Sequence, residues 1–508
     1  MPLMDTTTEP ETPAVAVPRP GGRRSLPWFD IVAVLVLGAA AGMLVFYKLT
    51  AKNLAADEAT SFFIAQLDWG RLWQSLATSE ANASAFYVSL HYWLTFGESE
   101  FVIRVLPAVF GLATVPVLYL VGARLFGRLA GIAAGALLAA NAFFVEQAQD
   151  LRGYSMSAFF VTLASWLFLR AVEKPTWPRW AAYAAAGTLG LYSHFFAALV
   201  LLAHLVSLLF LKWKDVPLKH VLAGYVSIGV LGGPLAYFIA FNDVGQVDWI
   251  PRLTAERALN GLEELAGRGS PMLVASAVLV LATLGVGLYH LATKRRSFET
   301  FKFLFVVGWV LFPIAFCLGI SLFKPLFVAR YLLVALPGIA LAGAAGLTLV
   351  RFKLLYAVAA IALVALAAIQ LDDFYRASPG LDWEAKADLV IAEAQPGDVA
   401  LFFAPTVIRP FGYYAGYYAE HETGLKAPGP IYPGINWLGY SATRFRPDLA
   451  AIESDVSQAR RLWLITGYAR DKPRQKEQAR IEALLAESCG QVLGGWFRGT
   501  VRLYGDCG

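Results

Sequence analysis

The stretch FDIVAVLVLGAAAGMLVFYKLTAKNLAADEATSF, residues 29–62, joins about twenty apolar residues to two adjacent carboxylates, Asp57 and Glu58. An apolar run of this length can cross a bilayer as a helix. The two acidic residues therefore lie close to the point where the chain leaves the hydrocarbon. Charge at that depth is costly, so we interpret the pair as functional. The alternative is that Asp57 or Glu58 only caps a helix at the membrane surface.

The composition of the whole chain is that of a membrane protein. Of its 508 residues, 57% are hydrophobic and 16% are charged, whereas about a quarter of the residues of a soluble domain are charged. Windows of about 19 residues predict about eleven transmembrane helices. They are residues 29–49, 101–122, 129–148, 155–172, 180–193, 195–211, 221–241, 272–293, 303–323, 332–350 and 354–371.

Basic residues predict how these helices are oriented. Arg23 and Arg24 precede the first span, and each short loop on that side of an eleven-span topology contains Lys or Arg, which is typical of cytoplasmic loops. Merging the short spans 180–193 and 195–211 into one bent helix is the alternative, but it would put three basic loops outside. We therefore predict a multi-pass protein of the cytoplasmic membrane, with residues 1–28 as a disordered cytoplasmic tail.

Residues 372–508 then form a small α/β domain outside the cytoplasm. The pattern predicts buried strands at 398–403 and 460–466, an amphipathic helix at 474–487 and an edge strand within WFRGTVRLYG, residues 496–505. A disulfide between Cys489 and Cys507 is plausible in an oxidising compartment.

Two aromatic stretches of this domain, FGYYAGYY (411–418) and YPGINWLGY (432–440), could stack on sugars. Core packing is the use that we favour for both.

Two outer loops contain the candidate site. The first, residues 50–100, holds Asp57 and Glu58 among many aromatic residues, and amphipathic interfacial helices are its expected content. The second is brief, FFVEQAQDLRGYS, and places Glu146, Asp150 and Arg152 at the membrane edge. Either acid could simply pair with Arg152, but two acidic clusters on one face favour a site.

Cations and a histidine approach the same face. Arg330 and Lys324 lie in FKPLFVARYLL, before the tenth span. An arginine there either extends to lipid headgroups or binds a phosphate through two parallel hydrogen bonds. His194 lies at the turn in LYSHFF, where a lone histidine is more often structural than a ligand.

Five stretches in this order resemble one family, and they cover roughly residues 29–350. They are DEATSF, YVSLHYWLTFGESEFVIRVLPAVFGLATVPVLYLVGARLFGR, EQAQDLRGYSM, WAAYAAAGTLGLYSHFFAALVLL and FKPLFVARYLLVALPG. The chain resembles the bacterial protein O-mannosyltransferase-like glycosyltransferases, which have the membrane-embedded C-type fold. LDWEAKADLVIAEAQPGDVALFF, residues 381–403, resembles the outward domain that many bacterial members append.

The resemblance implies an inverting enzyme that moves a sugar from a polyprenyl-phosphate carrier to a lipid, glycan or protein acceptor outside the membrane. By motif, Asp57 is the base and Glu58 orients the acceptor or the base. Asp150 contacts the acceptor or a metal, and Arg152 binds phosphate or holds Asp150. No cofactor is certain, and Mg²⁺ or Mn²⁺ remains open. The resemblance further implies two phosphate ligands and four cavity-lining residues, which are Lys324, Arg330, Tyr154, His194, Tyr331 and Glu146.

One departure and two rival functions remain. Relatives commonly have an HPPLYY-type stretch where this chain has NASAFY, residues 82–87, which puts substrate or activity in doubt.

A lipid-linked sugar transporter would distribute acids through its spans, whereas here they gather at one face. A catalytically impaired cell-envelope scaffold is the second rival.

Overall fold

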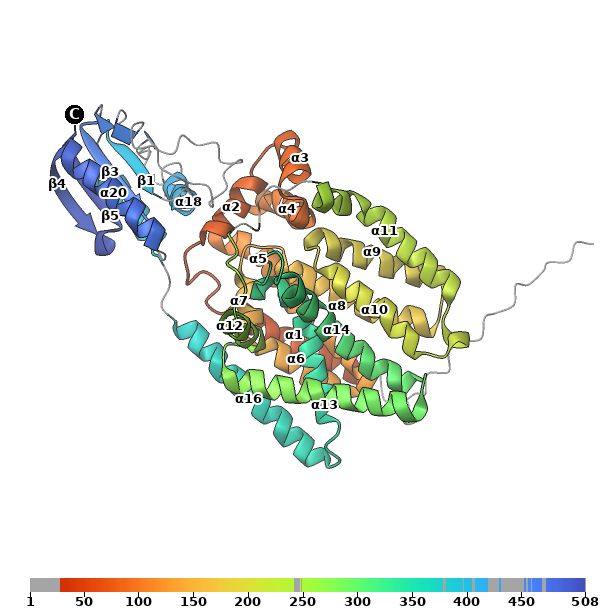
Figure 1. The fold of residues 1–508 in the computed structure, drawn as a ribbon. Helices are drawn as coiled ribbons and strands as arrows, with labels where there is room; N and C mark the ends of the chain where they lie inside the picture. Colours follow the sequence, from red (N-terminus) through yellow and green to blue (C-terminus); the bar gives the residue numbers. More distant parts are fainter. Residues whose placement is uncertain are drawn as a thin grey trace, which may run out of the picture.

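The computed structural model is a bundle of long helices with a small sheet domain at one end (Figure 1). It describes residues 28–241, 247, 249–377, 381–395, 397–403, 407–418, 429–430, 452–453, 456–457, 459–467 and 472–507. The predicted tail therefore lies outside the described residues, except for Trp28, which begins the first helix.

Every predicted span overlaps a helical element. These elements are α1 (Trp28–Phe46), α5 (Glu100–Phe126), α6 (Arg128–Ala139), α7 (Ala142–Gln149), α8 (Tyr154–Glu173), α9 (Trp177–Ser193), α10 (Ala197–Ser207), α11 (Leu218–Phe241), α13 (Ser270–Lys294), α14 (Phe298–Ile320), η5 (Ala329–Ala335) with α15 (Leu336–Leu347), and α16 (Lys353–Arg376). In the described part of the chain, 8 helices are long and apolar enough to cross a membrane, or 9 if α6 and α7, which are bent by 61°, form one span. The predicted polytopic helical fold is confirmed, while α9 and α10 are shorter than the other spans.

The chain reverses direction between α9 and α10. The Leu201 side chain packs over Gly187, and Ala197 packs over Gly190, as in a helical hairpin centred on His194. The two helices lie side by side in Figure 1. Residues 180–211 are therefore two helices and not one bent helix.

The break between α6 and α7 has a specific cause. Asn141 caps α7 by accepting a hydrogen bond from the Phe144 amide at 2.8 Å. Its side-chain amide also donates to the carbonyl of Ala266 at 3.1 Å, at the end of α12 (Ala255–Ala266). A cap with a cross-link in the middle of a span satisfies the backbone groups that the bend exposes. The bend directs α7 toward the outer edge of the bundle, where Asp150 follows it.

The first outer loop contains three helices, α2 (Ala56–Ala65), α3 (Trp69–Thr78) and α4 (Ser84–Trp93). The amphipathic prediction holds for α3, because Leu72 and Leu76 are buried while Trp69 and Trp73 are exposed. α2 begins directly before Asp57 and Glu58, and the Glu58 carboxylate accepts a hydrogen bond from the Ala55 amide at 2.8 Å. Capping is therefore one real function of Glu58.

The C-terminal domain is a five-stranded sheet in the order β2-β1-β3-β5-β4. Its strands are β1 (Val399–Phe403), β2 (Gly429–Pro430), β3 (Arg461–Thr466), β4 (Cys489–Trp496) and β5 (Val501–Cys507), and its helices include α17 (Trp383–Glu393), α18 (Ile408–Tyr418) and α20 (Lys472–Ser488). β1 pairs in parallel with β2 and β3, whereas β5 is antiparallel to β3 and β4. The two predicted buried strands and the helix are confirmed.

The predicted edge strand across residues 496–505 is confirmed as a strand only from Val501, and its place at the sheet edge is wrong. A 3₁₀ turn, Phe497–Gly499, interrupts it with positive φ at both Phe497 and Gly499, so residues on either side belong to different strands. β5 is also an inner strand, with β3 and β4 as its neighbours. Apolar and polar residues alternate through this turn as they do in a strand, so the sequence pattern did not indicate the turn.

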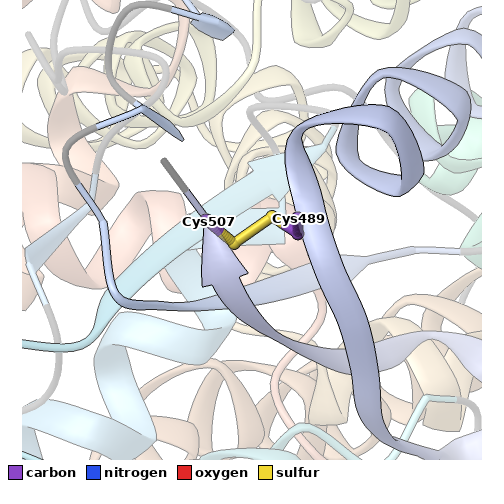
Figure 2. The surroundings of a disulfide bond; sticks show 2 residues. All are labelled: Cys489 and Cys507. Carbon is purple, nitrogen blue, oxygen red and sulfur yellow. A yellow bond between two sulfur atoms is a disulfide. The ribbon is translucent and has the colours of Figure 1, made fainter.

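The predicted disulfide is present. Cys489 opens β4 and Cys507 ends β5, and the two lie opposite one another in the antiparallel register (Figure 2). The stretch 432–440 lies outside the described residues. In contrast, 411–418 forms most of α18, where Phe411, Tyr413 and Tyr414 are buried, so the core-packing interpretation is confirmed for that stretch.

The C-terminal domain and the first outer loop share a hydrophobic core. α18 lies beside α2 in Figure 1, and the rings of Tyr413 and Phe62 meet at 4.9 Å between centroids. The Tyr413 hydroxyl donates to the Glu98 carbonyl at 2.7 Å. The Tyr414 hydroxyl accepts from the Leu54 amide at 2.8 Å and donates to the Glu100 carboxylate. The domain is therefore docked on the loop that contains Asp57.

Candidate active site

Asp57 and two arginines from distant parts of the chain meet at the outer end of the bundle. Asp57 lies in the first turn of α2, and its carboxylate forms an ion pair of 3.1 Å with Arg330, which follows the first residue of η5. Arg152, in the loop between α7 and α8, donates to the Asp57 carbonyl at 3.4 Å and to the Ser61 hydroxyl at 3.3 Å. Three predicted site residues are thus brought together.

The charges around Asp57 keep it ionised. Burial among the surrounding helices alone would raise the pKa of the carboxyl, but Arg152, Arg330 and Arg409 outweigh that effect and hold its pKa below the usual value. About half of the side-chain surface, 49%, remains accessible to water. Asp57 is therefore an anion that a substrate can reach.

Arg330 has hydrogen-bonding capacity to spare. Among the described residues, its buried Nε atom has no hydrogen-bond partner. Its guanidinium lies 5.2 Å from the ring centroid of Trp249 and 5.9 Å from that of Tyr154. Because a guanidinium presents parallel donors that match the oxygens of a phosphate, this arrangement fits an incoming phosphate group.

Asp150 lies at the end of α7, beside the same group of residues. Burial raises the pKa of Asp150 to about 8, the negative charge of Glu58 adds to the effect, and Arg152 opposes it. The carboxyl is therefore mainly protonated and neutral at pH 7. A neutral carboxyl can donate a hydrogen bond, which an ionised one cannot.

Glu58 has a different place from its neighbour. It is 5% exposed, and its two oxygens accept from Nε and Nη2 of Arg104 at 2.9 Å each. One of these oxygens also accepts from the Leu151 amide at 3.1 Å. Both oxygens of Glu58 already accept two hydrogen bonds from the protein, so the carboxylate has no site left for the predicted contact with an acceptor. Glu58 instead fixes α2 and the loop that contains Asp150 and Arg152.

An aromatic group forms one wall of the site. The ring of His194 lies 5.1 Å from that of Tyr331 and 5.4 Å from that of Tyr154, between centroids. His194 is buried, and its Nε2 atom has no partner among the described residues. Asn82, the residue at the departure from the family pattern, accepts a hydrogen bond from the Phe195 amide at 2.9 Å. Asn82 therefore holds the turn that presents His194.

Two predicted residues are placed differently. Glu146 pairs with Arg268, at the end of α12, and not with Arg152. Lys324 is exposed on the turn after α14, in contrast to the half-buried Arg330. The predictions that Glu146 lines the cavity and that Lys324 binds phosphate stay predictions.

The sequence reasoning did not select three residues of this region. Arg104 lies inside a predicted span and within the second of the five family stretches, but it was given no role there. Glu80 accepts a hydrogen bond from the Tyr87 hydroxyl at 3.0 Å, and burial raises the pKa of Glu80 while Arg152 opposes this. Arg409 reaches the site from α18. A charged residue inside an apolar run was the one available signal, and it applied only to Arg104.

The described carboxylates of the site face arginines. Asp57 faces Arg330, and Glu58 faces Arg104. Within the described residues, no group of three or more His, Cys, Asp or Glu side chains is close enough to hold a metal ion. Mg²⁺ is usually held by one or two carboxylates together with substrate phosphates, so a site for Mg²⁺ or Mn²⁺ stays a prediction.

Comparisons with known proteins agree with this architecture. The family model described as dolichyl-phosphate-mannose-protein mannosyltransferase matches residues 80–235. No curated protein matches the chain. The chain is similar to the crystal structure of ArnT from Cupriavidus metallidurans in the apo state, with a TM-score of 0.59 and 13% identity over 94% of this chain and 98% of that one.

Two further structures contain a lipid phosphate. ArnT from Cupriavidus metallidurans bound to undecaprenyl phosphate matches with a TM-score of 0.60 and 13% identity, over 93% of this chain and 98% of that chain. The oligosaccharyltransferase AglB from Archaeoglobus fulgidus, in complex with an inhibitory peptide and a dolichol-phosphate, matches with a TM-score of 0.52 and 12% identity. The match covers 94% of this chain and 74% of that chain. The fold of membrane-embedded C-type glycosyltransferases, predicted from the resemblance, is confirmed.

Glu58→Gln should destabilise the fold, because the Arg104 charge, buried at 3% exposure, then keeps only the Glu100 carboxylate, at 3.3 Å, as an ionic partner. Breaking a buried pair from one side costs about 3–5 kcal/mol. The measurement is thermal unfolding of the full chain in detergent. Asp57→Asn is the matched control and should unfold close to wild type, since Asp57 is half exposed. Equal stability of Glu58→Gln and wild type would contradict the assignment.

Proposed function

We propose that this protein is an inverting glycosyltransferase that moves a sugar from a polyprenyl-phosphate carrier to a lipid, glycan or protein acceptor at the outer face of the cytoplasmic membrane. The observation that supports it most is the 3.1 Å pair between an accessible carboxylate, Asp57, and an arginine with spare donors, Arg330. The site thus combines a base with a phosphate ligand. ArnT bound to undecaprenyl phosphate has the same fold, and so does AglB with a dolichol-phosphate.

Donor binding would prepare the base. In the free enzyme, Asp57 and Arg330 neutralise one another. The phosphate of the donor competes for the Arg330 guanidinium, because it offers more acceptor oxygens and carries negative charge. Once Arg330 turns to the phosphate, Asp57 loses part of the stabilisation of its anion and becomes a stronger base. The enzyme therefore gains basicity only when the donor is present.

Transfer would then follow in one displacement. The acceptor's nucleophilic atom forms a bond to the anomeric carbon while the bond from that carbon to the phosphate oxygen breaks, which inverts the configuration. Asp57 takes the proton of the acceptor. Polyprenyl phosphate leaves with the electron pair, and Arg330 and Arg152 stabilise the charge that develops on its oxygens.

Asp150 would serve the acceptor side as a neutral hydrogen-bond donor. If Asp150 were ionised as well, three negative groups would crowd the site, namely Asp57, Asp150 and the donor phosphate. Its raised pKa avoids this at neutral pH. His194, with its unpartnered Nε2 against two tyrosine rings, is positioned for the hydroxyls of the sugar.

Orientation rests on the loops and on the cysteines. The basic loops support a cytoplasmic N-terminus, and the disulfide between Cys489 and Cys507 supports an oxidising compartment outside the cytoplasm for the C-terminal domain. Asp57, Arg330 and the docked C-terminal domain then share the outer face. A transporter that uses the same cavity is the competing proposal, and transport of lipid-linked sugar across vesicles by the purified protein would favour it.

Asp57→Asn should reduce sugar transfer by about 10²–10⁴-fold, because the acceptor loses its base. The assay uses purified protein, membrane lipid extract and a panel of radiolabelled polyprenyl-phosphate sugars. Asp68→Asn is the matched control, since Asp68 is an exposed acid of the same loop that caps α3 and pairs with Arg71. Wild-type rates in Asp57→Asn, or no turnover of any donor by folded wild type, would contradict the proposal.

The same assay tests for a metal. We propose that transfer needs no bound divalent ion, since the acidic side chains of the site already face arginines. Turnover should stay within about twofold after EDTA treatment, because the arginines supply the charge that Mg²⁺ would otherwise provide. A loss that added Mg²⁺ or Mn²⁺ restores would show that a metal takes part.

Asp150→Asn should remove a transition in the pH profile. As the pH rises through about 8, wild-type Asp150 ionises, and its charge repels the donor phosphate, so the KM for the donor should increase. Asparagine resembles the neutral acid and cannot ionise, so Asp150→Asn should keep neutral-pH turnover and a flat KM above pH 8. An inactive Asp150→Asn at pH 7 would mean that the ionised form is the working one.

A further inference from the structure

We propose that Arg409, on α18 of the C-terminal domain, is a positioning residue for the base Asp57, so that the docked C-terminal domain is part of the active site. This inference rests on the proposed function in assigning Asp57 as the base. The contact itself, in which an arginine of the C-terminal domain lies beside α2, does not depend on the reaction.

The first support is a direct contact. Nη1 of Arg409 donates to the Thr60 hydroxyl at 2.6 Å. Thr60 donates its own proton to the Ala56 carbonyl at 2.7 Å, so its oxygen is free to accept from the arginine. Thr60 follows Asp57 by three residues on α2, and residues with that spacing are neighbours on one helix face. The guanidinium is therefore held on the Asp57 side of the helix.

The second support is that α18 has little freedom to place Arg409 elsewhere. Tyr413, one turn later on α18, packs on Phe62 and bonds to the Glu98 carbonyl. Tyr414 bonds to the Leu54 amide. These contacts precede α2, lie within it and follow it along the chain. Docking of the domain and placement of Arg409 are consequently one event.

The third support is electrostatic. The groups that face Asp57 are three arginines, two acids and a phenol from four segments of the chain, namely Arg152, Arg330, Arg409, Glu80, Asp150 and Tyr331. Arg152 and Arg330 are the arginines that we expect the donor phosphate to engage. Arg409 bonds to α2 itself, so its charge stays beside Asp57 after the phosphate arrives. It also acts on Glu80, where it opposes the effect of burial.

The consequence concerns control of the base. With Arg330 drawn to the donor, the pKa of Asp57 would rise, and a protonated Asp57 cannot accept a proton. Arg409 keeps the carboxylate ionised while leaving its oxygens toward the acceptor. An undocked domain would remove this charge and lower activity near neutral pH.

The test compares Arg409→Gln, Arg409→Lys and Tyr413→Phe in the full chain. Tyr413→Phe is the matched control, because it removes only the hydrogen bond to Glu98, while the ring packing on Phe62 and the Tyr414 bond to Leu54 keep α18 docked with every charge in place. The first readout needs no turnover. It is a pH titration by infrared difference spectroscopy, in which subtraction of the Asp57→Asn spectrum isolates the carboxyl of Asp57.

The midpoint of the Asp57 titration should move to higher pH in Arg409→Gln and stay near wild type in Arg409→Lys and Tyr413→Phe. Equal midpoints in wild type and Arg409→Gln would overturn the inference. Should Arg409→Gln not fold, Thr60→Val removes the acceptor that holds the guanidinium and should move the midpoint in the same direction. No shift in that variant would likewise overturn it.

The second readout is the pH profile of sugar transfer. The acid limb should move to higher pH in Arg409→Gln and not in Tyr413→Phe. If the infrared midpoint moves but wild type transfers no sugar, the coupling stands and the proposed function fails. If wild type is active and neither the midpoint nor the acid limb moves, the function stands and the role of Arg409 fails.

Discussion

The buried ion pair between Arg104 and Glu58 fixes the geometry on which the rest of the site depends. Arg104 donates to the Glu58 carboxylate and to the carbonyls of Leu49 and Lys52, and Glu58 in turn accepts from the Leu151 amide. One pair thus joins the end of the first span, the start of α2, the span α5 and the loop after α7. Burying two charges is worthwhile only when their hydrogen bonds are satisfied, and here both side chains are almost fully engaged. The pair therefore fixes the position of Asp57 on α2 and of Arg152 in the loop after α7.

Asp57 and Glu58 are adjacent in the sequence, but helix geometry gives them different partners and therefore different roles. Consecutive residues on a helix point about 100° apart, so Glu58 faces inward to Arg104 while Asp57 faces Arg330. Environment, and not residue type, separates their roles. The same holds for Asp150, whose burial and proximity to Glu58 keep it neutral while Asp57 is ionised. A site with one ionised and one protonated carboxyl can bind an anionic donor without strong repulsion.

Sequence patterns gave the spans, the strands and the principal site residues because these depend on local signals. Apolar length predicted the helices, and the family resemblance predicted Asp57, Arg152 and Arg330, which the structure brings together. It could not separate Glu58 from Asp57, because the partner of Glu58 lies 46 residues away. It did not indicate the partner of Glu146, because Arg268 is 122 residues distant. It could not find Arg409, since nothing in IRPFGYYAGYY indicates that α18 packs on α2. Long-range electrostatic partners are set by tertiary packing, to which a single sequence gives no access.

The location of the site follows from the needs of its two substrates. A polyprenyl chain must stay in hydrocarbon while its phosphate stays hydrated or paired, and this restricts the phosphate to the headgroup level. Arg330, the second residue of η5, follows the exposed turn 322–324 and precedes buried residues, so in the proposed reaction it would meet the phosphate there. An acceptor comes from the aqueous side, so something must enclose the reacting atoms there and exclude water. In this chain α18 and the first outer loop form a common core directly beside Asp57. In the proposed reaction the helical bundle would supply the phosphate ligands and the C-terminal domain the cover, so either part alone would give the base only part of its electrostatic environment.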